Sequence, residues 1–91
     1  MVLRLIIENV KNETYVVTLH AEEEIDNDGL SIIDIEYVLL NCEILEKQKD
    51  KITKENKYRV RGKTWLGRII EIIVKISPTG KLVIITVYSI L

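Results

Sequence analysis

The sequence predicts an α+β fold, in which N-terminal helices pack on an antiparallel β-sheet of three to four strands connected as a meander. One observation is that the spacing of the apolar residues changes from the helical period to a period of two near Glu43. A second is that 35 of the 91 residues are Ile, Leu or Val, which can form a hydrophobic core and excludes a disordered chain. At this length, we expect one domain over residues 1–91.

Two helices are expected near the start of the chain. The first is predicted by apolar residues at the i, i+3, i+4 and i+7 positions of one helical face: Leu3, Ile6, Ile7 and Val10. The second begins near His20 with Thr18 as the expected N-cap, and Gly29 suits the left-handed conformation that follows a helix end. The pattern leaves open whether residues 15–18 form a strand.

A third helix is expected to begin after Ser31. Ser31 and Asp34 have the spacing of a capping-box variant, in which the two side chains satisfy free backbone N–H groups. The run from Ile35 to Cys42 is apolar around most of the helix, so we expect this helix to be largely buried. Cys42 is most simply a small core residue.

Four segments with a period of two follow and predict the strands of the sheet. They are Ile44 to Lys49, Tyr58 to Trp65, Arg68 to Ser77, and Lys81 to Ser89. The segment from Gln48 to Lys57 is rich in lysine, has Ile52 as its one long apolar residue, and is expected to be a mobile loop.

The charges are divided unequally along the chain. Residues 1–46 contain 2 basic and 11 acidic residues, whereas residues 47–91 contain 11 basic and 3 acidic residues. The two halves therefore carry net charges near −9 and +8. A domain with this separation can present a positive face to phosphates, or the two halves can neutralise each other by surface ion pairs.

Composition excludes several classes of protein. One cysteine and one histidine cannot form an intramolecular disulfide framework or a structural zinc site, and the sequence has no glycine-rich phosphate loop and no nucleophile elbow. We therefore expect no metal and no cofactor. No long uninterrupted apolar run occurs, so neither a signal peptide nor a membrane span is expected, and the expected location is cytoplasmic.

Alternation along the second predicted strand places three cations and an indole on one face: Arg59, Arg61, Lys63 and Trp65. Single-stranded RNA binds to surfaces of this kind, because cations contact phosphates and an aromatic ring stacks on a base. The alternative is an ordinary solvent-facing strand whose charges protect an edge against aggregation.

His20 is the one side chain whose unperturbed titration lies near neutral pH, and Glu23 and Glu24 follow on the same side of a helix. Such a histidine can act as an acid–base catalyst, or it can be a hydrogen-bonded residue over the sheet. Arg68 and Tyr88 lie at positions that could meet near one end of the sheet. There they could stabilise an oxyanion and donate a proton during phosphodiester cleavage, or Tyr88 could belong to a cross-strand packing pair.

The stretch from His20 to Tyr88 resembles the bacterial family called domain of unknown function 4258. The matching residues are Leu19-His20-Ala21-Glu22, Asp34-Ile35-Glu36 with Val38-Leu39-Leu40, Gly62-Lys63-Thr64 with Gly67-Arg68, and the closing run Gly80 to Tyr88. The resemblance implies a fold similar to ribonuclease toxins of the RelE and BrnT kind. It also implies a small antitoxin partner, often a zinc ribbon.

Many family members carry arginine four and eight residues after the histidine, where this chain has Glu24 and Asp28. Either the phosphate-binding cations lie elsewhere in this chain, or the domain no longer acts on RNA. The first hypothesis is an RNA-binding or RNA-cleaving domain, a metal-independent endoribonuclease with His20, Arg68 and Tyr88 as catalytic residues. The alternative is a non-catalytic module that docks a partner protein or forms a homodimer.

Overall fold

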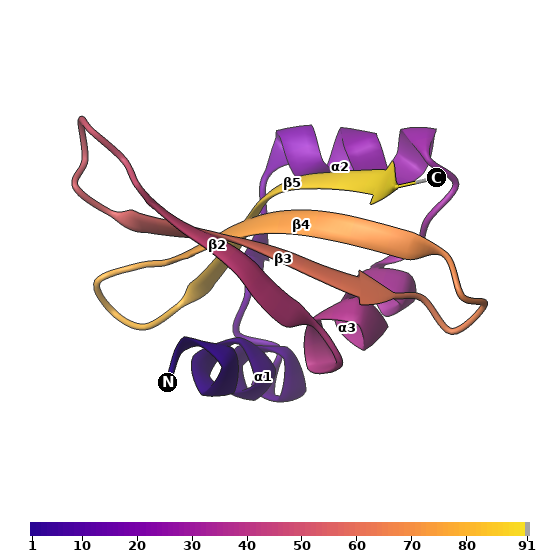
Figure 1. Ribbon diagram of the computed structural model, residues 1–91, viewed down its shortest axis with the longest axis horizontal. Coiled ribbons are helices and arrows are strands. Elements are labelled where there is room, and N and C mark those ends of the chain that lie inside the picture. The colour runs from indigo at the N-terminus through magenta and orange to yellow at the C-terminus, as the bar shows by residue number, and fades with distance from the viewer. Residues whose placement is uncertain (91) are drawn as a thin grey trace.

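The computed structural model describes residues 1–90, which form three helices and a five-stranded sheet (Figure 1). In chain order the elements are α1 (Val2–Asn12), β1 (Val16–Val17), α2 (Leu19–Asn27), α3 (Ile32–Leu40), β2 (Glu43–Lys49), β3 (Asn56–Lys63), β4 (Ile69–Ile76) and β5 (Leu82–Ile90). The α+β class and the N-terminal position of the helices are confirmed.

The sheet has the strand order β1-β5-β4-β3-β2. Strands β2 to β5 are antiparallel neighbours in chain order, but β1 pairs with β5 in parallel. The expectation of three to four strands that are all antiparallel is therefore wrong. Strand β1 has only two residues, Val16 and Val17, which is too short for a period to be detected, and its register opposite Val83 and Ile84 is set by the tertiary structure.

The helix caps predicted from the sequence are confirmed. The Thr18 hydroxyl oxygen accepts a hydrogen bond of 3.1 Å from the backbone N–H of Ala21 at the start of α2. Ser31 and Asp34 form the reciprocal capping box of α3. The expectation that α3 is largely buried holds for Ile35, Val38 and Leu39, which are buried, but not for the first turn, where Ile33 is 71% exposed.

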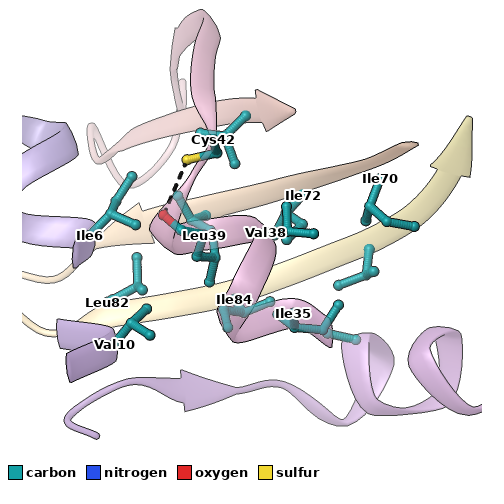
Figure 2. Packing of buried hydrophobic residues seen from close by; sticks show 14 of the residues in the cluster. Ile6, Val10, Ile35, Val38, Leu39, Cys42, Ile70, Ile72, Leu82 and Ile84 are labelled. Carbon is teal, nitrogen blue, oxygen red and sulfur yellow. Dashed lines mark hydrogen bonds between the residues drawn. The ribbon is translucent and has the colours of Figure 1, made fainter. Parts of the chain in front are cut away.

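The core lies between the helices and one face of the sheet (Figure 2). Buried side chains come from all three helices and from β3, β4 and β5, including Ile6 and Leu39 of the helices and Ile72 of β4. Cys42 lies at the margin of this core and donates a hydrogen bond to the Leu39 carbonyl oxygen at 3.5 Å, and burial raises the pKa of its thiol to about 11. Cys42 is a core residue, as predicted.

Close packing fixes α3 on β3 at Gly62. A Cβ atom at Gly62 would lie 3.1 Å from both the side chain and the carbonyl oxygen of Val38. A larger residue would push α3 away from the sheet, so glycine sets the distance between these two elements.

Asn9 of α1 connects this helix to the turn between β4 and β5. Its amide nitrogen donates to the carbonyl oxygens of Leu5 at 2.8 Å and Gly80 at 3.0 Å, and its amide oxygen accepts from the backbone N–H of Leu82 at 3.1 Å. This buried side chain therefore supplies hydrogen-bond partners to the Gly80 carbonyl and the Leu82 N–H at the β4–β5 turn.

The lysine-rich loop is shorter than predicted. Strands β2 and β3 extend to Lys49 and from Asn56, so only residues 50–55 connect them, and the hairpin projects from the sheet (Figure 1). The Asp50 carboxylate accepts hydrogen bonds of 2.9 Å from the backbone N–H groups of Ile52 and Thr53. These bonds order the tip of the hairpin.

Candidate nucleic-acid interface

A groove of about 530 Å³ lies where α3 ends beside the end of β3. Its lining includes residues of α3, of the C-terminal end of that helix, of β3 and of the β3–β4 turn: Tyr37, Asn41, Arg61, Lys63 and Trp65. Gly62 forms part of the groove wall, so the close approach of α3 to β3 also shapes this site.

Two aromatic rings stand together in the groove. The rings of Tyr37 and Trp65 pack edge to face, with centroids 5.6 Å apart and an interplanar angle of 86°. Trp65 is 77% exposed, so much of the indole remains free to contact a ligand. A flat ring that is held on one side and exposed on the other can stack with a nucleobase.

A tight turn after β3 positions Trp65. The backbone N–H of Thr64 donates to the Arg68 carbonyl oxygen at 2.8 Å, and the buried Thr64 hydroxyl accepts from the Arg68 backbone N–H at 3.1 Å. Gly67 has a φ of +90°, which favours glycine in this turn. Because Trp65 lies in this turn and not in β3, it contacts α3 and does not continue the row of cations.

Arg61 and Lys63 supply positive charge to the groove. Lys63 is exposed and forms no salt bridge with any of residues 1–90. The Arg61 side chain is 42% exposed and is held by Glu71 of β4, which accepts from its Nε at 2.8 Å and from its Nη2. The groove lining therefore includes a lysine without a salt bridge among the described residues, an arginine held by Glu71 and one exposed acidic residue, Glu43.

Glu71 is the centre of a polar cluster on the face of the sheet opposite the core. Its side chain is 3% exposed and also accepts hydrogen bonds from Arg59 Nη1 at 3.1 Å and from the Tyr88 hydroxyl at 2.6 Å. Burial raises the pKa of the Glu71 carboxyl, but the hydrogen bonds from its three partners outweigh burial and lower the pKa to about 2. The carboxylate thus stays ionised at neutral pH and orients both arginines.

The structure places three of the four predicted RNA-binding residues in one groove: Arg61, Lys63 and Trp65. Arg59 lies in β3 with Arg61 and Lys63 but is not part of the groove lining. Its Nε donates to Glu46 of β2 at 3.1 Å and its Nη1 to Glu71, and these two carboxylates raise the pKa of the guanidinium. Arg59 is therefore neutralised within the sheet.

The predicted catalytic residues do not come together. His20 lies 3.4 Å from Glu24 and its side chain is 67% exposed, while Glu24 also accepts from the Val87 backbone N–H. Arg68 donates to the Ser89 hydroxyl at 2.6 Å, whereas Tyr88 donates to Glu71. Tyr88 and Ser89 are adjacent in β5 and point to opposite faces of the sheet, so Arg68 and Tyr88 are directed to different sides.

Two important residues of this region were missed by sequence reasoning. Glu71 is the one charged residue in the run Ile69 to Val74, and antiparallel pairing of β3 with β4 places it opposite Arg61. That pairing was predictable, so the ion pair could have been found. Tyr37 carries no such signal, because its place beside Trp65 depends on how α3 packs on β3.

Within residues 1–90, no group of three His, Cys, Asp or Glu side chains could hold a metal ion. The helices of the described region are also too short and too polar to cross a membrane.

Helices packed on one face of a five-stranded mixed sheet, with an aromatic and cationic groove at one end, define a small α+β protein with a candidate polyanion-binding site. The chain belongs to the family described as Domain of unknown function (DUF4258), whose model matches residues 17–89. The predicted family membership is thereby confirmed, and α1 precedes the matched region. No curated protein and no solved structure shows a significant match to the chain.

Proposed function

We propose that this protein binds single-stranded RNA in the groove between α3 and the end of β3. The observation that carries the proposal is a groove of about 530 Å³ lined by two packed aromatic residues, Tyr37 and Trp65, and by two basic residues, Arg61 and Lys63. A base stacks on Trp65, and the adjoining phosphates contact Lys63 and Arg61. A single strand suits this groove better than a duplex, because duplex bases are already stacked on one another.

The ion pair with Glu71 supports this role for Arg61. A guanidinium group has five N–H donors, and Glu71 engages the Nε and Nη2 groups of Arg61. The remaining donors are available for a phosphate oxygen, while the carboxylate holds the side chain in place and reduces the entropy lost on binding.

The similarity to RelE and BrnT ribonuclease toxins, RNA cleavage, a cytoplasmic location and an antitoxin partner are further proposals. The helices that precede the antiparallel strands β2 to β5 support the toxin-like fold, and the pairing of His20 with Glu24 supports an acid–base role for the imidazole. Cleavage requires His20, Arg68 and Tyr88 to reach one phosphodiester, and these residues contact three different partners. We therefore propose binding, and not cleavage, as the principal function.

The test is a titration of fluorescein-labelled single-stranded RNA with the protein at several salt concentrations, measured by anisotropy. Trp65→Ala is expected to weaken binding by about 1–3 kcal/mol through the loss of stacking. Lys63→Ala is expected to make the slope of log K against log salt shallower by about 0.7, the value for one phosphate contact of a single strand.

Lys81→Ala is the matched control, because Lys81 is also an exposed lysine but lies in the β4–β5 turn, at the opposite end of the strands from the groove. This variant should retain wild-type affinity. The proposal would be refuted if the wild type showed no salt-dependent binding. It would also be refuted if Trp65→Ala and Lys63→Ala bound the RNA with wild-type affinity. Incubation of the same RNA with wild type and His20→Ala, followed by electrophoresis, tests cleavage separately.

A further inference from the structure

A second groove, of about 350 Å³, lies at the other edge of the sheet beside β1. Its apolar lining includes Val17 of β1, Ile25 of α2 and Leu30, and Ile32 adds a half-exposed side chain at the start of α3. The carboxylates of Glu22 and Asp26 also line it, and neither forms a salt bridge with any of residues 1–90. The groove therefore presents an apolar surface beside uncompensated negative charge.

The tip of the β2–β3 hairpin has the complementary chemistry. Ile52 is 90% exposed there, and it lies between Lys51 and Lys54, which are exposed and form no salt bridge within the described part of the chain. The Asp50 hydrogen bonds hold this tip in a defined shape, so an apolar side chain flanked by ammonium groups is presented outward. An apolar side chain on a projecting, ordered tip has the shape of an anchor that fills a pocket of a partner.

We propose that the hairpin tip of one chain docks in this second groove of another copy, with Ile52 on the apolar lining and Lys51 and Lys54 beside Glu22 and Asp26. Both members of the contact come from this chain, and the separation of charge between its two halves favours this pairing over random encounter. The contact is independent of the RNA-binding groove, which lies at the β3–β4 end.

The strand order determines the type of assembly. Strands β1 and β2 form opposite edges of the sheet, so the second groove and the hairpin tip lie on opposite sides of the molecule. Each copy thus inserts its hairpin tip into one neighbour and receives the tip of another neighbour in its second groove. This is a heterologous, head-to-tail contact. Such a contact adds further copies as the protein concentration rises, and screening by salt weakens it.

Two complementary variants test the proposal by sedimentation velocity on nucleic-acid-free protein. The groove variant combines Glu22→Lys and Asp26→Lys, and the tip variant combines Lys51→Ser, Ile52→Ser and Lys54→Ser. Wild type should show an average mass that increases with concentration and decreases in high salt. Each variant alone should remain monomeric, while an equimolar mixture should form a dimer and nothing larger, because only one intact tip meets one intact groove.

Glu23→Lys is the control, because Glu23 is exposed on α2 but does not line the groove, and it should associate as the wild type does. A far-UV circular dichroism melt shows that each variant is folded, and the substituted side chains are all exposed. A wild type that is monomeric at millimolar concentration, or a mixture of the two variants that stays monomeric, overturns the proposal. Since none of these experiments contains RNA, their failure is distinct from failure of RNA binding.

Discussion

Glu71→Gln is expected to lower the free energy of unfolding by about 2–3 kcal/mol at pH 7. The wild-type carboxylate accepts four hydrogen bonds, three of them from guanidinium groups, and its side chain is 3% exposed. Glutamine keeps one acceptor oxygen but turns an NH₂ group toward another donor. The variant thus loses at least one hydrogen bond to a charged group, worth about 1.5–3 kcal/mol, and leaves a partly buried guanidinium charge without compensation.

The difference between wild type and Glu71→Gln should depend on pH. The pKa of Glu71 falls from its ordinary value of 4.5 to about 2 in the folded protein. A carboxyl whose pKa is lower when folded contributes stability above its unfolded pKa and loses that contribution as the pH falls through its folded pKa. The difference should therefore be constant near neutral pH and shrink between about pH 5 and pH 2.

Urea denaturation followed by circular dichroism at a series of pH values measures both effects. Glu55→Gln is a matched control, because Glu55 pairs with Lys75 at 3.0 Å but is more exposed, and such a surface pair contributes about 1 kcal/mol or less. If Glu71→Gln were no more destabilising than this control, or if its effect were the same at pH 3 as at pH 7, the reasoning about the cluster would be wrong.

Three further substitutions probe the fold. Asn9→Ala should destabilise the protein by about 2–3 kcal/mol in urea denaturation, since it leaves backbone groups of the β4–β5 turn without partners, including the buried N–H of Leu82; wild-type stability would contradict this. Gly62→Val should lower the free energy of unfolding by about 1–3 kcal/mol, because it pushes α3 away from the sheet. An unchanged thermal melt would show that α3 can move away from the sheet without loss of stability. Burial and the 2.5 Å hydrogen bond to Glu36 raise the pKa of Tyr15 to about 12. Tyr15 thus adds stability below pH 10 that is lost as the pH rises through 12. In an ultraviolet titration of the tyrosines, Tyr15→Phe should remove one ionisation at the high-pH end. An unchanged titration would refute the assignment of that ionisation to Tyr15.

Local features of the fold were predictable because their causes lie within a few residues of sequence. Thr18 and Ser31 cap helices through bonds to residues three positions later, and the alternation of Arg59, Val60 and Arg61 defines the two faces of β3. These signals do not depend on tertiary structure.

Features that depend on distant contacts could not be predicted in the same way. Strand β1 exists because Val16 and Val17 meet β5, which begins 65 residues further along the chain. The site has the same limit. Lys63 was found by alternation and Trp65 by its residue type, but Trp65 lies in the turn after β3 and Tyr37 joins it only through the packing of α3 at Gly62. The expected meeting of His20, Arg68 and Tyr88 rested on strand order alone, which does not specify the side of the sheet to which each residue points.

Trp65 is the single tryptophan of the sequence, so its fluorescence reports directly on the proposed site of base stacking. Titration with unlabelled single-stranded RNA should quench the Trp65 emission with the same dissociation constant that anisotropy gives, and added salt should restore the emission as the RNA dissociates. RNA binding with no change in Trp65 emission would place the RNA elsewhere on the protein. An emission that no RNA concentration alters, together with an unchanged anisotropy, would contradict the RNA-binding account itself.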